Sequence, residues 1–268
     1  MIRIEGSVEE FYEWLLPVAA VADETRVFIG PEGIKIKVVD PANVIMIDMD
    51  LPKSAFYDYE VDETLKAGFD LCEIKGMFES TEDSELAVMN IITSSECHKG
   101  YPEVKVSTLE LLTEGGLVNS VSTLPPESLR KAPELPSMDY TAHFKMTRRL
   151  FKKILDMANR TSDYIELKAE KVEDVKWQYR LTALAEGDRS RRFRAVLDSG
   201  SEDVGCVACV RDSASLYSLD YLREIVDAIK SDKSLSMDFG QDWPLTISFE
   251  VLNGGTAKYS IAPRVESE

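Results

Sequence analysis

Histidine and cysteine are scarce in this chain of 268 residues, which has two histidines and four cysteines. The cysteines stand at irregular positions, unlike a disulfide framework; they are Cys72, Cys97, Cys206 and Cys209. The last two form one Cys-x-x-Cys in a β-like run, where positions three apart point to opposite faces. A zinc site there would need two further ligands. The scarcity favours a reducing cytoplasm and gives no support to zinc binding or histidine-dependent nucleophilic catalysis.

Long apolar runs are also missing. No run approaches the roughly 18 residues of a membrane-spanning helix. The opening MIRIEGSVEEF has no basic region followed by an apolar stretch, as a secretory signal would have. We therefore expect a cytoplasmic protein with no membrane partner.

Positive charge is in short supply, because 31 lysine and arginine residues face 48 aspartate and glutamate residues, for a net charge of −17. Such an acidic excess favours solubility and repels nucleic acid over most of a surface. A well-solvated surface is the simplest explanation. Any contact with nucleic acid must come from a local basic patch and not from overall charge.

Motifs for cofactors and catalysis are weak. The glycine pairs in EGGL and NGGT lack the strand–glycine–helix context of a phosphate loop, so we expect no cofactor. Asp48 and Asp50 alternate along an apolar run and share one strand face. They could be a metal pair or the polar side of an amphipathic strand. No histidine or third carboxylate lies close in sequence, which favours the second interpretation and predicts neither a metal site nor catalytic residues.

The apolar periodicity changes between helical and alternating segments in the same order in each half of the chain. It predicts helices at 7–23, 63–79, 147–163 and 213–231, with strands between and after them. Ser7 is a candidate cap for the first helix, and Pro17 should kink or shorten it. The stretch 113–136 is rich in Gly, Ser and Pro and predicts an extended linker. Two similar α+β halves are the natural architecture.

The third predicted helix carries the densest basic cluster. Its apolar stripe includes Phe151 and Leu155, and its other side carries Arg149, Lys152, Lys153 and Arg160. Basic residues at helical spacing suit contact with phosphates without base recognition; a solvated helix face is the alternative. A second cluster lies on or beside a strand and consists of Arg189, Arg191, Arg192 and Arg194.

Two stretches, GIKIKVVDPANVIMIDMDLP at 33–52 and LNGGTAKYSIAPRVESE at 252–268, resemble the sliding clamps of the proliferating cell nuclear antigen (PCNA) family, most closely archaeal ones. The first resembles a signature of that family's first domain, and the second resembles its last strand. The block SLDYLREIVDAIKSDKSLSMDFGQDWPLTISFEV at 218–251 also looks like the family's final helix–strand block. The resemblance spans nearly the whole chain.

The resemblance implies an α+β fold of two topologically similar clamp domains, with sheets outside and helices lining the hole of a ring. The domains would be 1–120 and 137–268, joined by an interdomain linker at 121–136. Three chains would join head to tail around duplex DNA and catalyse nothing. The ring would tether DNA polymerase, clamp loader, flap nuclease and ligase through short peptide motifs, at the nucleoid in the cytoplasm.

The resemblance also implies two sets of site residues. A partner peptide would bind a hydrophobic pocket between the linker and the C-terminal strand, formed by Val39, Asp40, Asn43, Leu129, Arg130, Ala132, Pro244, Ala262, Pro263, Arg264 and Val265. Duplex DNA would face Lys66, Lys75, Arg149, Lys152, Lys153, Arg160, Arg223 and Lys230.

The sequence departs from the family pattern in charge. The first helix is acidic where many members carry lysines, at Glu9, Glu10 and Glu13. Acidic residues also fall where the hole would be basic, at Asp156, Asp220 and Asp227. These departures leave open a clamp-like subunit that works only in a hetero-oligomeric ring. A metal-dependent two-domain enzyme using Asp48 and Asp50 is a third, less favoured hypothesis.

Overall fold

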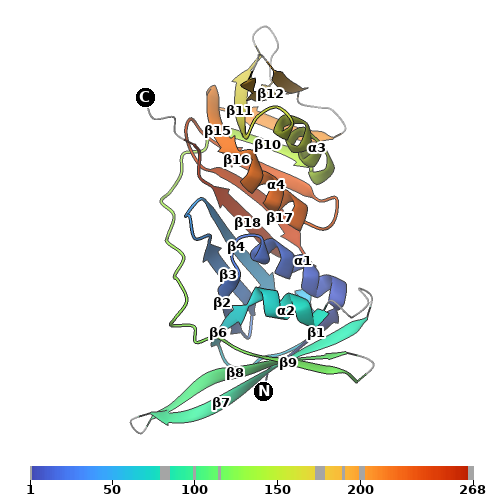
Figure 1. Ribbon diagram of the computed structural model, residues 1–268, viewed down its shortest axis with the longest axis vertical. Helices are drawn as coiled ribbons and strands as arrows, with labels where there is room; N and C mark the ends of the chain where they lie inside the picture. The colour runs from blue at the N-terminus through green and yellow to red at the C-terminus, as the bar shows by residue number, and fades with distance from the viewer. Residues whose placement is uncertain are drawn as a thin grey trace. The chain divides into compact units, whose positions relative to one another are not determined.

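The internal contacts of the chain divide it into two compact units. The computed structural model (Figure 1) describes residues 2–78, 85–98, 101–113, 116–172, 179–188, 191–198 and 203–264. Unit 1 consists of Met1–Asp40, Ile47–Ala132 and Glu250–Ala257, and unit 2 consists of Pro41–Met46, Pro133–Phe249 and Lys258–Glu268. The main boundary, between Ala132 and Pro133, lies inside the stretch 121–136 predicted as the linker.

The first half of the chain alternates strands with two helices. Its elements are β1 (Ile2–Ser7), α1 (Val8–Ala19), β2 (Glu24–Gly30), β3 (Gly33–Val39), β4 (Ile45–Pro52), the 3-10 turn η1 (Lys53–Ala55), β5 (Asp58–Glu60), β6 (Leu65–Asp70), α2 (Leu71–Phe78), β7 (Leu86–His98), β8 (Tyr101–Thr113) and β9 (Val118–Ser122).

The second half repeats this order of strands and helices. Its elements are β10 (Ala142–Thr147), α3 (Arg148–Asn159), β11 (Tyr164–Lys171), β12 (Tyr179–Glu186), β13 (Arg192–Asp198), β14 (Val204–Cys209), β15 (Ser213–Ser218), α4 (Leu219–Ala228), β16 (Ser234–Phe239), β17 (Leu245–Val251) and β18 (Gly255–Ile261). The predicted α+β class with two similar halves is confirmed.

Strand pairing repeats in the two halves, through the following antiparallel pairs. β1 pairs with β5 and β7, β7 with β8, and β8 with β9. Correspondingly, β10 pairs with β14 and β16, and β16 with β17. A second group of strands also pairs alike in the two halves: β2 with β3 and β6 in the first, and β11 with β12 and β15 in the second. Figure 1 shows α1 beside α2 and α3 beside α4, each pair packed on the strands of its own unit.

Local signals explain where the helices begin. Ser7 and Glu10 form a capping box at the start of α1, in which each side chain accepts the backbone N–H of the other residue. Thr147 caps α3 by accepting a first-turn N–H at 3.2 Å. α1 runs through Pro17 and ends two residues later, where a proline removes few helical hydrogen bonds.

The structure corrects three predicted elements. Residues 63–79, predicted as one helix, form strand β6 and then α2, and Asp70 begins the helix by accepting the N–H of Glu73 at 3.0 Å. The predicted helix 213–231 likewise opens with strand β15. Strand β9 lies within the stretch 113–136 predicted as linker, because it pairs with β8. β6 and β15 pair with the distant strands β2 and β11, and this pairing overrides the local apolar spacing; β9 instead pairs with the strand just before it in sequence.

Aromatic side chains fill the core of each unit. The rings of Phe11 and Phe78 stack at 5.5 Å in unit 1, where Trp14 is also buried. Phe144 and Phe239 meet edge to face at 5.8 Å in unit 2. No helix within the described ranges is long and apolar enough to cross a membrane.

Candidate functional site

Asp48 and Asp50 lie on the exposed face of β4 and form salt bridges with lysines of the neighbouring strand β3. Lys35 Nζ lies 2.9 Å from Asp50, and Lys37 Nζ lies 4.0 Å from Asp48. The hydrogen bond to Asp50 and the charge of Asp50 raise the pKa of Lys35. Across the residues that the structure describes, no group of three metal-ligating side chains comes together. The polar-face interpretation of these two aspartates is confirmed.

Helices α3 and α4 of unit 2 are joined by charged groups. Lys152 forms a salt bridge with Asp227 of α4 and lies 3.9 Å from Asp156, one turn along its own helix. Arg223 of α4 reaches back to Asp156, with 3.2 Å between Nε and Oδ1. Asp156 therefore holds one cation from each helix.

Arginines at the start of α3 are also engaged by their own unit. The backbone N–H of Arg149 donates to Asp232 at 2.8 Å, and its guanidinium lies 3.5 Å from Asp203 and 3.8 Å from Asp232. Arg148 Nε donates to the carbonyl oxygen of Val226 at 2.9 Å. Part of the basic charge predicted to face DNA is therefore already paired with protein groups.

Other predicted DNA-facing residues are more open. Lys153 and Arg160 are exposed on α3 and its C-cap, Lys75 is exposed on α2, and none of the three forms a salt bridge with any described residue. Lys230 is exposed just after α4. Lys66 is on strand β6 and not on a helix. Its ammonium lies 5.6 Å from the ring centre of Phe28.

The acidic residues of α1 have structural partners. Glu10 closes the capping box with Ser7. Glu13 Oε2 accepts the backbone N–H of Leu252 at 3.1 Å. Glu9 is exposed in the first turn, where the positive end of the helix dipole stabilises a carboxylate.

The linker residues predicted to bind a partner peptide dock on unit 1. Leu124 donates its N–H to Gly68 at 2.8 Å, and a side chain at Gly68 would collide with Leu124 O at 2.4 Å, so only glycine permits this approach. Arg26 then donates to the carbonyl of Leu129, whose side chain is buried. Arg130 donates to the carbonyl of Asp40 at 3.5 Å. The linker thus lies against Asp40, which directly follows Val39 at the end of β3; both are predicted site residues. Ala132 is half-buried.

The remaining predicted peptide-site residues belong to unit 2. The carbonyl of Val44, next to Asn43, accepts the N–H of Ala262 at 2.8 Å. Pro263 and Pro244 are half-buried, and the carbonyl just before Pro244 accepts the hydroxyl of Tyr217 at 2.8 Å. Val265 lies outside the described residues. The backbone contact joins Ala262 to Val44, the neighbour of Asn43, within one unit.

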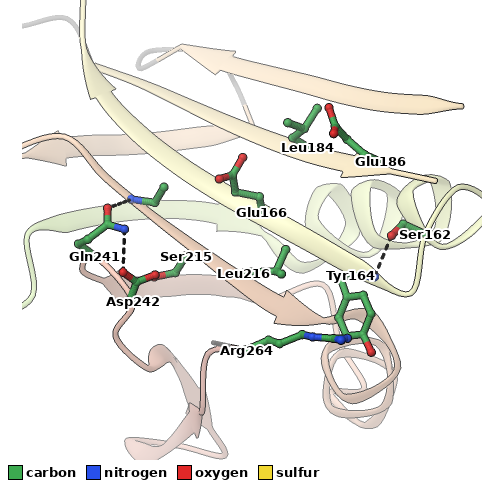
Figure 2. Close-up of a pocket in the computed structure, with 11 residues that line it drawn as sticks. Ser162, Tyr164, Glu166, Leu184, Glu186, Ser215, Leu216, Gln241, Asp242 and Arg264 are labelled. Carbon is green, nitrogen blue, oxygen red and sulfur yellow. Dashed lines mark hydrogen bonds between the residues drawn. The ribbon is translucent and has the colours of Figure 1, made fainter. Parts of the chain in front are cut away.

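Arg264 is fixed at both ends of its side chain. Its N–H donates to the carbonyl of Leu216 at 2.8 Å, and its guanidinium lies 3.7 Å over the ring centre of Tyr164. The stack borders a pocket drawn in Figure 2. Apart from Arg264, the sequence analysis named none of the residues lining this pocket.

Comparisons with known proteins show which family the chain belongs to. No family model matches the chain. A DNA polymerase sliding clamp of Methanosarcina barkeri is 30% identical over 269 residues, which cover 100% of both chains. The chain belongs to the DNA polymerase sliding clamp family. The clamp of Halobacterium salinarum is 26% identical over 268 residues, again covering both chains fully.

Solved clamp structures resemble this one closely. The PCNA of A. fulgidus, solved with the C-terminal region of FEN-1, matches this clamp with a TM-score of 0.83 and 26% identity over 100% of both chains. The PCNA of Thermococcus kodakaraensis shares the fold, with a TM-score of 0.82, 22% identity, and 98% and 100% coverage. The resemblance to archaeal PCNA is confirmed, and members of this family are replication processivity factors without catalytic activity.

Each unit of the clamp has an edge strand with exposed apolar side chains. In the strand order β5-β1-β7-β8-β9, β9 is at the edge, and Val118 on it and Leu117 before it are 57% and 68% exposed. In the order β13-β12-β11-β15, β13 is at the edge, with Val196 at 44% exposure. Arg192 and Arg194 of the second basic cluster lie on β13, whereas Arg189 is outside the described residues.

Proposed function

We propose that three copies of this clamp close head to tail into a ring around duplex DNA. The observation that carries the proposal is a pair of edge strands with exposed apolar side chains, β9 in unit 1 and β13 in unit 2. An edge strand with exposed apolar residues is a template for pairing with another chain. Because the two edges differ, pairing β9 of one copy with β13 of the next gives a heterologous interface, and such an interface forms a ring where the rotation closes.

The DNA contact in this proposal is weak and independent of sequence. Lys153, Arg160 and Lys75 would meet phosphates. Arg223 would do so only by leaving Asp156, and Lys152 only by leaving both Asp227 and Asp156. A topological link needs few phosphate contacts, and tight ones would hinder sliding. The ring would therefore hold on to DNA mainly by encircling it, at the nucleoid.

The partner site in this proposal takes short peptide motifs of DNA polymerase, clamp loader, flap nuclease and ligase. Support comes from the likeness to the PCNA of A. fulgidus, which was solved with the C-terminal region of FEN-1. It also comes from the linker and the Ala262–Arg264 segment, each held by backbone hydrogen bonds to its own unit. Segments held in this way reduce the entropy lost when a peptide binds.

The ring is tested by native mass from size exclusion with light scattering, at several concentrations and salts. We expect roughly 90 kDa, three times the chain mass of 30.1 kDa. Val118→Glu and Val196→Glu should each give monomers, because each places a charge on an edge strand. Val210→Glu is the matched control, since Val210 is 89% exposed and lies outside both edges.

A monomer at every concentration and salt would contradict the homotrimer. If that monomer assembled only with a second clamp chain, the hetero-oligomeric alternative would replace it. If both edge variants still form trimers, the interface does not use β9 and β13.

A further inference from the structure

Unit 2 has a pocket of about 510 Å³ on the face of strands β11, β12 and β15 that points away from the core. Ile165 and Leu167 of β11 are buried in the core, so the alternate residues Tyr164 and Glu166 point to the other face. Figure 2 shows Glu166 between the two neighbouring strands, with Arg264 and Tyr164 at one end.

The charge of Glu166 acts on Lys168, two positions along β11, and the Glu166 carboxylate itself lines the pocket. Two other carboxylates line it, but Glu186 forms a salt bridge with Arg192, and Asp242 accepts a hydrogen bond from Gln241 at 2.9 Å. Within the described parts of the chain, Glu166 forms no hydrogen bond or salt bridge. The only cation in the lining, Arg264, is stacked on the ring of Tyr164.

The surroundings of Glu166 are apolar along the sheet. Its direct partner on β12 is Leu184, and its direct partner on β15 is Leu216. Directly paired residues of an antiparallel sheet lie on the same face. A carboxylate between two leucines suits a lysine or arginine side chain, which buries its aliphatic stem against apolar groups and keeps its charged end at a polar partner.

The backbone edge beside the pocket is already occupied, which excludes binding by strand addition. Ala214 receives the N–H of Asp242 at 3.2 Å and donates its own N–H to Gln241 Oε1 at 3.0 Å. The carbonyl of Leu216 accepts the N–H of Arg264. A peptide can therefore place a side chain in this pocket but cannot pair its backbone with β15 at these positions.

We propose that this pocket is a second subsite for the partner peptide and takes one basic side chain from the flank of its motif. The proposal rests on the proposed partner function, because Arg264 belongs both to the pocket and to the proposed peptide site. A basic side chain would pair with Glu166, lie between Leu184 and Leu216, and be covered at one end by the Arg264–Tyr164 stack. Partners with a basic flank would then bind in preference to partners without one.

The probe is a synthetic peptide of the C-terminal region of FEN-1 in which a single lysine is moved through each flanking position, with glutamine as its neutral counterpart. Fluorescence anisotropy at low salt measures the dissociation constant. We expect one position at which lysine tightens binding about fivefold over glutamine. This gain should disappear in Glu166→Gln, while the glutamine peptide binds both proteins equally.

Glu170→Gln is the matched control. Glu170 lies on the same face of β11, outside the pocket, and pairs with Lys168 at 2.9 Å. The control should keep the full gain from lysine. If no flanking lysine tightens binding, or if the gain persists in Glu166→Gln, this inference is overturned while the peptide site stands. If no peptide binds the wild-type chain at all, the proposed partner function and this inference both fail.

Discussion

The two helix pairs occupy the same place in the element order but are joined by different chemistry. Between α1 and α2, the ring of Phe78 lies 5.5 Å from the rings of both Phe11 and Tyr12. Between α3 and α4, Arg223 pairs with Asp156 and Lys152 pairs with Asp227. The same topology therefore accommodates aromatic packing between the helices of one unit and ion pairs between the helices of the other. We call the first contact the aromatic seam and the second the charged seam.

The two kinds of contact affect different properties, because aromatic packing acts on stability and the ion pairs act on the charge available to DNA. Burial of aromatic rings contributes several kcal/mol and hardly depends on salt. Half-exposed ion pairs contribute about 0–1 kcal/mol, but they occupy cations that phosphates could otherwise reach. The charged seam of unit 2 therefore has its main consequence for DNA contact, and the aromatic seam of unit 1 for folding.

The largest effect expected from this comparison is on the aromatic seam. Phe78→Ala should lower the free energy of unfolding by about 3–5 kcal/mol, because Phe78 is 1% exposed and its removal leaves a cavity. Urea denaturation followed by circular dichroism measures it. Tyr57→Ala, at a residue 61% exposed, should cost less than about 1 kcal/mol. Equal losses in both variants would show that the seam is unimportant.

The next effect concerns Lys153 and Arg160, which form no salt bridge with any described residue. The double variant Lys153→Glu with Arg160→Glu should weaken binding to duplex DNA by about tenfold or more at low salt, since both residues lie exposed on α3 and its cap. The apparent affinity for a duplex oligonucleotide, titrated at several salt concentrations, measures this. Lys35→Glu, on the sheet strand β3, is the control. An unchanged salt dependence in the double variant would exclude α3 from the DNA contact.

A smaller effect distinguishes the acidic residues of α1. Glu10→Ala should cost about 1 kcal/mol of stability because it opens the capping box with Ser7. Glu9→Ala removes the same charge without a side-chain hydrogen bond and should cost only about 0.3 kcal/mol. Thermal unfolding compares the two. Equal costs would mean that acidity alone, and not the cap, explains Glu10.

The smallest effect is a gain. Asp156→Asn should raise DNA affinity about threefold and steepen its salt dependence, because Arg223 becomes available to phosphates, whereas Lys152 keeps its salt bridge with Asp227. Stability should change by less than about 1 kcal/mol. Asp50→Asn, which removes a carboxylate paired with Lys35 on the sheet, should leave DNA affinity unchanged. Weaker DNA binding in Asp156→Asn would contradict the competition between carboxylates and phosphates.

Sequence periodicity predicts most strands and the order of the two halves, because one buried face imposes alternation. It fails at Phe69–Leu71, where apolar residues continue from β6 into α2 without a glycine or proline between them. Asp70 with Glu73 three residues later was the available signal, since an acidic cap followed by glutamate marks a helix start.

For the candidate sites too, the sequence predicted some residues and missed others. The resemblance identified Arg130 and Arg264 for the peptide site, although it gave no indication that Arg264 stacks on Tyr164. The pairing of Asp156 with Arg223 joins positions 67 residues apart, and the pocket around Glu166 combines three strands and a loop. Such contacts depend on the tertiary fold, so no local pattern reveals them.

The most direct test of the clamp function compares release from circular and linear duplex DNA. The protein is loaded onto nicked circular DNA by a clamp loader, and the retained fraction is measured at a salt concentration that abolishes phosphate contacts. A ring that encircles DNA stays on the circle and slides off once the DNA is cut. Equal release from both forms would mean that the chain binds DNA only by contact, contradicting the topological link.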